Sequence, residues 1–294
     1  MTPELAESYA WCREVARSQA RNFYYAFTVL PPEKKAAMCA IYAFMRFSDD
    51  ITDDENDTDR HARLARWRQA LDDALQGRYG DSRILPAFHD TVRRYGIPGR
   101  FFHALIDGAE MDLVPRRYET FEELRRYCYH VASVVGIVCI HVWGFTGGEA
   151  ALAPAEDCGI AFQLTNILRD LKEDGERGRV YLPREDLRRF GCSEADLLAG
   201  VVDDRFRALM KFQVDRAREF YRRGAALLPH LSPDGRSTFT VMYRIYRGVL
   251  DRIEAQGYDV FASRAQLSVA RKAGIVARVW LGSHVPALAR AGGV

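Results

Sequence analysis

The segment KKAAMCAIYAFMRFSDDITDD, residues 34–54, decides how this chain folds. Its hydrophobic residues recur with helical spacing and fill most of its length, so residues 34–52 are predicted to form a largely buried α-helix. The segment nevertheless ends in a run of aspartates, although the helix dipole favours cations at a C-terminal end. A group outside this helix must therefore stabilise the aspartates.

Two of these aspartates, Asp49 and Asp53, are four residues apart, so they share one face of the predicted helix with Tyr42 and Arg46. Carboxylates on adjacent turns repel each other, and the repulsion grows when water is excluded. A divalent cation removes the repulsion, and Mg²⁺ binds carboxylate and phosphate oxygens while it keeps several waters. The spacing therefore predicts an Mg²⁺ site. A solvated loop with an Asp or Thr cap is the alternative.

A second apolar helix, predicted over residues 150–174, also ends in acids. Its last part and the segment after it read QLTNILRDLKEDGERGRVYLP, residues 163–183, in which Asn166, Asp170 and Asp174 are spaced by four. One helix face therefore carries an amide and two carboxylates. An ordinary charged helix end is the alternative interpretation of this segment.

The two acidic helix ends point to one shared function. If they face each other across a cavity, they can hold a Mg²⁺–diphosphate cluster beside an apolar pocket, which is the arrangement needed to ionise an allylic C–O bond. The sequence contains no P-loop, dinucleotide-binding, nucleophile-elbow or zinc-protease motif that would compete with this interpretation. The residues alone thus favour a metal-dependent enzyme that acts on an allylic diphosphate.

Helical periodicity extends through the chain, interrupted by Pro and Gly, and the sequence shows no alternating strand pattern. We therefore expect an all-α fold in which residues 1–294 form a single domain, a helical bundle around a central cavity. The other predicted helices cover residues 4–28, 59–77, 81–95, 99–113, 120–145, 203–228 and 234–256.

The composition limits the partners and the compartment. The 294 residues are 48% hydrophobic and 28% charged, with a net charge of +2, which is typical of a globular protein and gives no reason to expect nucleic-acid binding. The six cysteines lack zinc-binding spacing and are expected to be reduced thiols. The most apolar run, residues 131–145, is too short to span a bilayer, and the N-terminus lacks a signal-peptide core. We expect a cytoplasmic protein, with peripheral contact to the inner face of the membrane for product release.

Four segments of the chain resemble, in order, the motifs of the squalene/phytoene synthase family, and the resemblance extends from about residue 8 to residue 261. The segments are NFYYAFTVLPPEKKAAMCAIYAFMRFSDDITDD (22–54), YCYHVASVVG (127–136), AFQLTNILRDLKEDGERGRVYLP (161–183) and YRIYRGVLDRIEAQGYDVF (243–261). The resemblance implies the isoprenoid synthase fold, with two aspartate-rich motifs on opposite walls of a cavity. It also implies a prenyltransferase that joins two prenyl diphosphates head to head.

The resemblance implies roles for individual residues as well. Those implied to bind Mg²⁺ are Asp49, Asp50, Asp53, Asn166, Asp170 and Asp174. Those implied to bind the substrate are Arg21, Asn22, Phe23, Phe27, Tyr42, Arg46, Val131, Gly136, Gln163, Asn166, Arg169 and Tyr246. Those implied to be catalytic are Arg46, Asp49, Asp170 and Tyr127, the last of which matches a tyrosine that handles a proton in the first half-reaction. Ala20 and Asn22 replace the two serines that usually flank the basic residue in this family, and only Asn22 can still donate a hydrogen bond.

Within this class we expect condensation of two farnesyl diphosphates to presqualene diphosphate, squalene or dehydrosqualene. Mg²⁺ is the expected cofactor, and NADPH is required if the product is squalene. The alternatives are condensation of two geranylgeranyl diphosphates to phytoene, a class I terpene cyclase, and a non-catalytic helical scaffold. A cyclase has Ser/Thr and Glu at the positions of Asp170 and Asp174, and a scaffold is expected to lose its metal ligands. The length of the prenyl chain, the final product and the oligomeric state remain open at this level.

Overall fold

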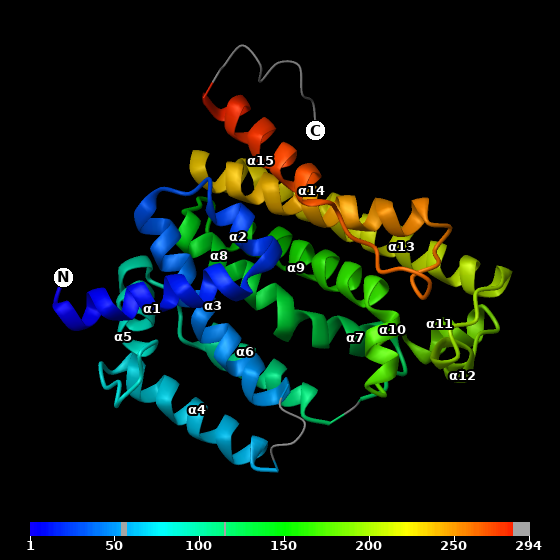
Figure 1. The fold of residues 1–294 in the computed structure, drawn as a ribbon, viewed down its shortest axis with the longest axis horizontal. Helices are drawn as coiled ribbons and strands as arrows, with labels where there is room; N and C mark the ends of the chain where they lie inside the picture. Colours follow the sequence, from blue (N-terminus) through cyan, green and yellow to red (C-terminus); the bar gives the residue numbers. More distant parts are fainter. Residues whose placement is uncertain (54–57, 115, 285–294) are drawn as a thin grey trace.

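The computed structural model describes the chain over residues 1–53, 58–114 and 116–284. Side chains are described within these ranges except at residues 21–23, 53, 283 and 284. The regular structure of this part of the chain is helical, and the only extended pairing in it is an isolated antiparallel bridge between Phe145 and Leu231. The prediction of an all-α, single-domain helical bundle is therefore confirmed (Figure 1).

Two series of helices, one following the other along the chain, make up the bundle. The first contains α1 (Pro3–Gln19), α2 (Arg21–Phe27), α3 (Pro32–Asp53), α4 (Arg60–Leu75), α5 (Leu85–Tyr95), α6 (Arg100–Asp112), α7 (Phe121–Cys128), the π-helical turn η1 (Tyr129–Ser133) and α8 (Val134–Trp143). The second contains α9 (Glu149–Arg169), α10 (Leu171–Glu176), α11 (Arg184–Arg189), α12 (Glu194–Leu198), α13 (Asp204–Gly224), the 3₁₀ turn η2 (Ala225–His230), α14 (Pro233–Ala255) and α15 (Val269–His284).

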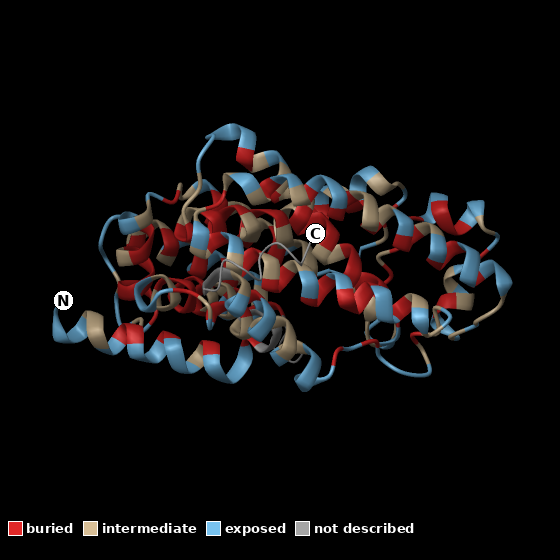
Figure 2. Ribbon diagram, turned by 90° about the horizontal axis from the view of Figure 1, so that it is seen from above, coloured by how far each residue is buried: buried red, intermediate tan, exposed pale blue. Residues whose placement is uncertain are grey.

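The helices that were predicted to end in acids, α3 and α9, form opposite walls at the centre of the bundle. Helix α3 packs against α1, α5, α6 and α8, whereas α9 packs against α13, α8, η1 and α14. Figure 1 shows α14 running beside α9 and α13, with α15 placed outside α14. Buried residues run through the middle of the bundle and exposed residues cover its outer faces (Figure 2). The candidate functional site lies between α3 and α9.

Glycines allow the π-helical turn η1 to pack tightly between α6 and α9. A Cβ at Gly159 of α9 would lie 2.4 Å from the Cα of Ser133, and a Cβ at Gly108 of α6 would lie 3.0 Å from the carbonyl carbon of His130. No side chain fits at 2.4 Å from a backbone atom, so Gly159 is required where it stands. This packing fixes the turn that presents Val131 and Ala132 to the central cavity.

The predicted helix boundaries fail where the backbone changes conformation. The helix predicted over residues 150–174 is divided at Asp170, which has φ −104° and ψ 15°. The helix predicted over residues 120–145 contains η1 and ends before Gly144, which has a φ of +87°. Periodicity alone cannot show either change, because the residues on both sides keep a helical pattern.

Some short or peripheral helices have no counterpart among the predicted ones. Helices α11 and α12 contain 6 and 5 residues, which is too few for a periodic pattern to be recognised. Helix α15 lies at the surface of the bundle, and it was not predicted although its sequence, VARKAGIVARVWLGSH, is rich in apolar residues. The helix predicted over residues 4–28 is divided at Ala20 into α1 and α2. Among the helices of the described ranges, none combines the length and the hydrophobicity needed to cross a membrane.

Candidate active site

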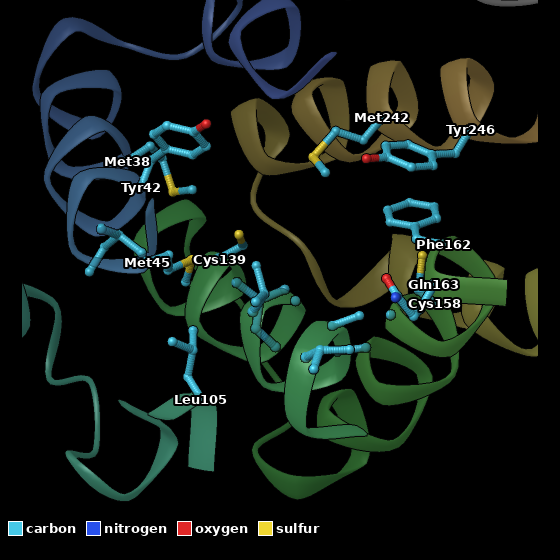
Figure 3. A pocket seen from close by; sticks show the side chains of 18 of the residues that line it. Met38, Tyr42, Met45, Leu105, Cys139, Cys158, Phe162, Gln163, Met242 and Tyr246 are labelled. Atoms are coloured by element: carbon cyan, nitrogen blue, oxygen red, sulfur yellow. The ribbon is translucent and has the colours of Figure 1, made fainter. Parts of the chain in front are cut away.

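An apolar cavity lies between α3, α6, η1, α8, α9 and α14. Figure 3 shows side chains of α3 on one side of it, facing side chains of α9 and α14 on the other. Those labelled on these walls are Met38, Tyr42, Met45, Cys158, Phe162, Gln163, Met242 and Tyr246. The cavity is lined by eight residues that were predicted from the sequence to belong to the site, namely Phe27, Tyr42, Asp49, Val131, Gly136, Gln163, Asn166 and Tyr246. Folding thus brings distant parts of the sequence together around one apolar space.

Aromatic rings stand on both sides of this cavity. The rings of Phe162 and Tyr246 stack with their centroids 4.5 Å apart and an interplanar angle of 15°. Tyr42 stands on the opposite wall (Figure 3). The face of an aromatic ring attracts a cation, so these walls can stabilise a carbocation that forms between them.

A more polar cavity, which we call the polar mouth, adjoins the apolar one and shares four lining residues with it. The shared residues are Tyr42, Asp49, Asn166 and Tyr246. Its cationic lining residues are Arg169, Arg264 and Lys272. Arginine binds phosphate oxygens through paired hydrogen bonds. The polar mouth therefore suits a diphosphate group whose hydrocarbon tail enters the apolar cavity.

Two of the cations of the polar mouth, Arg264 and Lys272, were missed by sequence reasoning. They follow α14, beyond the last segment that resembles the family, which ends at residue 261. The local signal is the basic pattern of RAQLSVARK, residues 264–272. Such a pattern is common on solvated surfaces, so it could not be assigned to a site before the fold was known.

The first acidic motif reaches the polar mouth through Asp49, which lines both cavities. Its neighbour Asp50 forms an ion pair with Arg46. The side chains of four predicted residues lie outside the described part of the chain, namely Arg21, Asn22, Phe23 and Asp53. The structure therefore places Asp49 at the junction of the two cavities, and the functions of the other residues of this motif stay predictions.

The second acidic motif keeps its helical spacing although the helix is interrupted at Asp170. The amide of Asp170 donates to the carbonyl oxygen of Asn166 over 2.9 Å, and the amide of Asp174 donates to the carbonyl oxygen of Asp170 over the same distance. Both bonds keep the four-residue spacing of an α-helix. The prediction of an unbroken helix over residues 150–174 is thus wrong, but the backbone still offers the three side chains at helical intervals.

Arginines surround the carboxylate of Asp170. The Nε of Arg169 donates to it over 2.8 Å, and the Nε of Arg264 also donates to it over 2.8 Å. One turn further on, burial and then the charge of Asp170 raise the pKa of Asp174 to about 7. A bound cation would favour the ionised form of Asp174 and would compete with the arginines for Asp170.

Asn166 has an unusual environment for a buried amide. Its Nδ2 donates to the Oε1 of Gln163 over 3.3 Å. Its Oδ1 is buried and accepts no hydrogen bond from the residues that the structure describes. An unsatisfied buried acceptor is costly, and amide oxygens are suitable ligands for hard cations. The donor set at the polar mouth therefore fits a divalent cation near Asn166.

This metal site would be completed by the substrate. In the described ranges, no three histidine, cysteine, aspartate or glutamate side chains converge closely enough to hold a metal by themselves. Mg²⁺ often binds through one or two carboxylates together with substrate phosphates and water. The arrangement of Asp49 and Asn166 beside the cationic residues of the polar mouth matches that mode of binding.

Tyr127 lies in a buried cluster of phenols beside Asp112, which lines the apolar cavity. Its Oη donates to the carboxylate of Asp112, at 2.9 Å from Oδ1 and 3.2 Å from Oδ2. Its ring stacks on that of Tyr181 with centroids 5.2 Å apart. Sequence reasoning missed Asp112, although an acid that closes an apolar helix, in this case α6, is the same signal that identified Asp49.

Comparison with known proteins places these features in a family. The family model for squalene/phytoene synthase matches residues 16–271. A 15-cis-phytoene synthase of Synechocystis sp. is 40% identical over 291 residues, which cover 95% of this chain and 86% of the relative. A 15-cis-phytoene synthase of Synechococcus elongatus is 40% identical over 280 residues, which cover 91% of each chain.

Solved structures share the fold over nearly the whole chain. A dehydrosqualene synthase in complex with a ligand has a TM-score of 0.87 and 29% identity, and the match covers 96% of this chain and 99% of that one. The squalene synthase HpnC of Alicyclobacillus acidocaldarius has a TM-score of 0.83 and 28% identity, with coverages of 88% and 97%. The isoprenoid synthase fold implied by the sequence is therefore confirmed.

These relatives correct one expectation. The expectation that two farnesyl diphosphates are the substrates is contradicted, because the relatives with 40% identity are named phytoene synthases. The structures of dehydrosqualene synthase and squalene synthase are less similar in sequence, at 29% and 28% identity. The same comparisons show a prenyltransferase, and they leave no support for a terpene cyclase or a non-catalytic scaffold. The protein belongs to the squalene/phytoene synthase family.

Proposed function

We propose that the protein joins two molecules of geranylgeranyl diphosphate head to head and forms phytoene. The observation that carries this proposal is the 40% identity, over 291 residues, to a protein named 15-cis-phytoene synthase. The shape of the site supports it, because an apolar cavity with a cationic mouth suits a ligand that has a hydrocarbon tail and an anionic head.

The acidic helix ends would hold Mg²⁺ in this proposal. The residues that would supply ligands are Asp49, Asp50, Asp53, Asn166, Asp170 and Asp174. When bound, the metal neutralises the charge of the diphosphate and so assists cleavage of the allylic C–O bond. The buried Oδ1 of Asn166 and the raised pKa of Asp174 both favour a cation at this place.

Cationic side chains would bind the two diphosphate groups. Arg169, Arg264 and Lys272 line the polar mouth, and Arg46 lies on the helix that carries Asp49. Arg169 and Arg264 bind Asp170 in this structure, so they would exchange this carboxylate for phosphate oxygens when the metal takes the carboxylate. The exchange would keep every charged group of the mouth paired.

The apolar cavity would protect the cation that ionisation leaves. The allylic cation would lie between the rings of Tyr42, Phe162 and Tyr246. The C2–C3 double bond of the second substrate attacks it, and loss of a proton closes a cyclopropane. A second ionisation, a rearrangement and loss of a second proton give phytoene. Protons leave and no hydride enters, so this reaction needs no NADPH.

The product identifies the substrate directly. We expect the purified protein to convert geranylgeranyl diphosphate to a C40 hydrocarbon when Mg²⁺ is present, with the same yield with and without NADPH. Farnesyl diphosphate is the matched comparison, and chromatography with mass spectrometry measures both products. A C30 product alone, or a cyclised product with the carbon count of a single substrate, would contradict the proposal.

We also propose that α15 contacts the membrane that receives the product. A C40 hydrocarbon is insoluble in water, so it must pass to an apolar phase. Helix α15 contains no acidic residue, and it exposes Val269, Trp280 and Leu281 by 67%, 49% and 42%. It begins beside the polar mouth, which Lys272 lines. A helix with arginine, lysine and exposed apolar residues suits an anionic lipid surface.

Vesicle binding tests this surface. We expect the protein to sediment with vesicles of anionic phospholipid, and we expect the double replacement Trp280→Ser and Leu281→Ser to weaken binding by about tenfold or more, because two exposed apolar side chains no longer enter the lipid. Trp11→Ser is the matched control, since Trp11 of α1 is 43% exposed. Equal binding of wild type and double variant, or equal loss in Trp11→Ser, would contradict a role for α15.

A further inference from the structure

One carboxylate at the edge of the apolar cavity has no place in the proposed metal site. Asp112 lines the cavity together with Leu105 and Ala109 of the same helix, α6. It accepts a hydrogen bond from Tyr127, and the Oη of Tyr181 lies 3.5 Å from its Oδ1 and 3.4 Å from the Oη of Tyr127. Two phenols therefore converge on one acid that is open to the cavity.

The direction of the hydrogen bond shows which group can take up a proton. Tyr127 is only 3% exposed, and burial, followed by the charge of Asp112, raises its pKa well above the usual value of 10. Its phenol therefore carries its proton at neutral pH. Such a phenol can accept a proton from a substrate only if it releases its own proton at the same time. The carboxylate of Asp112, to which it already donates, is the available acceptor.

We propose that Asp112 is the final proton acceptor of the first half-reaction and that Tyr127 relays the proton to it. As the cyclopropane closes, a C–H bond of the substrate breaks, its electron pair forms the new C–C bond, and the proton binds to the Oη of Tyr127. The original proton of Tyr127 passes to Asp112, which becomes a neutral acid. Tyr127 is again a neutral phenol after the step, and Asp112 returns its proton to solvent after the product leaves. This inference rests on the proposed head-to-head condensation.

The surrounding rings hold this relay in place. The rings of Tyr127 and Tyr181 stack at an interplanar angle of 26°, and the ring of Tyr118 lies 5.6 Å from that of Tyr127. Tyr181 donates to the same oxygen of Asp112 that receives the shorter bond from Tyr127. Tyr181 is thus a positioning residue, which orients the carboxylate and does not pass the proton itself.

Asp112→Asn separates proton transfer from hydrogen bonding. Asparagine keeps an acceptor oxygen for Tyr127, but it cannot take up a proton. In a single turnover we expect closure of the cyclopropane to slow by about 10²–10⁴-fold, the range of general acid–base groups, with little change in KM. Conversion of supplied C40 cyclopropyl diphosphate to phytoene should be retained, because the lost step precedes it. Asp112→Glu should restore part of the rate.

Asp107→Asn is the matched control for this variant. Asp107 lies on the same helix, its side chain is 48% exposed, and it pairs with Arg68. We expect this variant to keep the wild-type rate. Ring closure at the wild-type rate in Asp112→Asn would overturn the proposal. An equal loss in both half-reactions would also overturn it, because that result indicates a general structural role.

The wild-type protein offers a test that depends on no variant. The proton on the Oη of Tyr127 exchanges with solvent, whereas the C–H proton of the substrate does not, so the relay requires slower ring closure in D₂O. Direct transfer to released diphosphate gives the same rate in both solvents, and that result would also overturn the relay. If the wild type makes no C40 product from geranylgeranyl diphosphate, the proposed substrate fails instead. The same measurements are then made with the prenyl diphosphate that the protein does convert.

Discussion

Replacing Asp49 by asparagine is expected to lower turnover by about 10²-fold or more, because loss of a proposed metal ligand would remove several kcal/mol of charge stabilisation from the transition state. Asp49 lines both the apolar cavity and the polar mouth, so its carboxylate lies where the proposed binding mode joins the diphosphate to the hydrocarbon tail. The variant should fold normally, since removal of one of several neighbouring acids relieves repulsion in the metal-free protein. Initial rates over a range of Mg²⁺ concentrations measure the effect.

Asp215→Asn is the matched control for Asp49→Asn. Asp215 lies on α13, where it forms an ordinary exposed pair with Lys211, and its side chain is 51% exposed. Its replacement should leave the rate and the Mg²⁺ dependence unchanged, because exposed ion pairs contribute little. A wild-type rate in Asp49→Asn at saturating Mg²⁺ would remove this carboxylate from the proposed metal site.

The central part of the fold could be predicted from sequence because one local pattern carries it. Helix α3 is apolar for most of its length and ends in acids, and α9 is also largely apolar and is followed directly by Asp170 at its C-cap. Periodicity places the acids of each motif on one face. Helices pack by their apolar faces, so two such helices in one domain are expected to meet around a shared interior. Asp49 and Asn166 do line the same two cavities.

Contacts between distant segments could not be predicted in the same way. Arg264 reaches Asp170 across 94 residues of sequence, and Asp112 meets Tyr181 across 69. Local patterns contain no information on which of many arginines or aspartates will approach a given helix end. The interruption of the helix at Asp170 was missed for a related reason, since Leu171 keeps the helical spacing of Ile167 and Leu168 across it.

The length of the substrate was predicted incorrectly for a physical reason. The motifs that carry the family resemblance line both the polar mouth and part of the apolar cavity, and farnesyl and geranylgeranyl diphosphates share the same diphosphate group. They differ in the length of the hydrocarbon tail, and the cavity proposed to hold the tail is lined by side chains from α3, α6, α8, α9 and α14 together. The depth of such a cavity depends on how these helices pack, so it cannot be derived from the spacing of residues within any one of them.

Asp174→Asn is expected to make the metal-free protein more stable while it abolishes Mg²⁺-dependent turnover. Burial and the charge of Asp170 raise the pKa of Asp174 from 3.8 to about 7, so the folded protein opposes its ionisation. Below about pH 3 the carboxyl is protonated in both the folded and the unfolded chain, so it does not change the free energy of unfolding. As the pH rises toward 7, the unfolded chain ionises first, and the free energy of unfolding falls.

Asparagine cannot ionise, so the gain in stability should be absent at about pH 3, grow through about pH 7 and become constant at about pH 8, at up to about 4 kcal/mol. Urea unfolding at several pH values in the presence of a chelator measures this gain.

Asp170→Asn is the informative control, because Asp170 accepts hydrogen bonds from Arg169 and Arg264 and its loss should destabilise the protein by about 1.5–3 kcal/mol. The two acids belong to one motif, but their replacements should change the free energy of unfolding in opposite directions. If Asp174→Asn is no more stable than the wild type at pH 8, burial does not oppose ionisation of Asp174. The metal-free protein then gives no evidence that this carboxylate needs a cation.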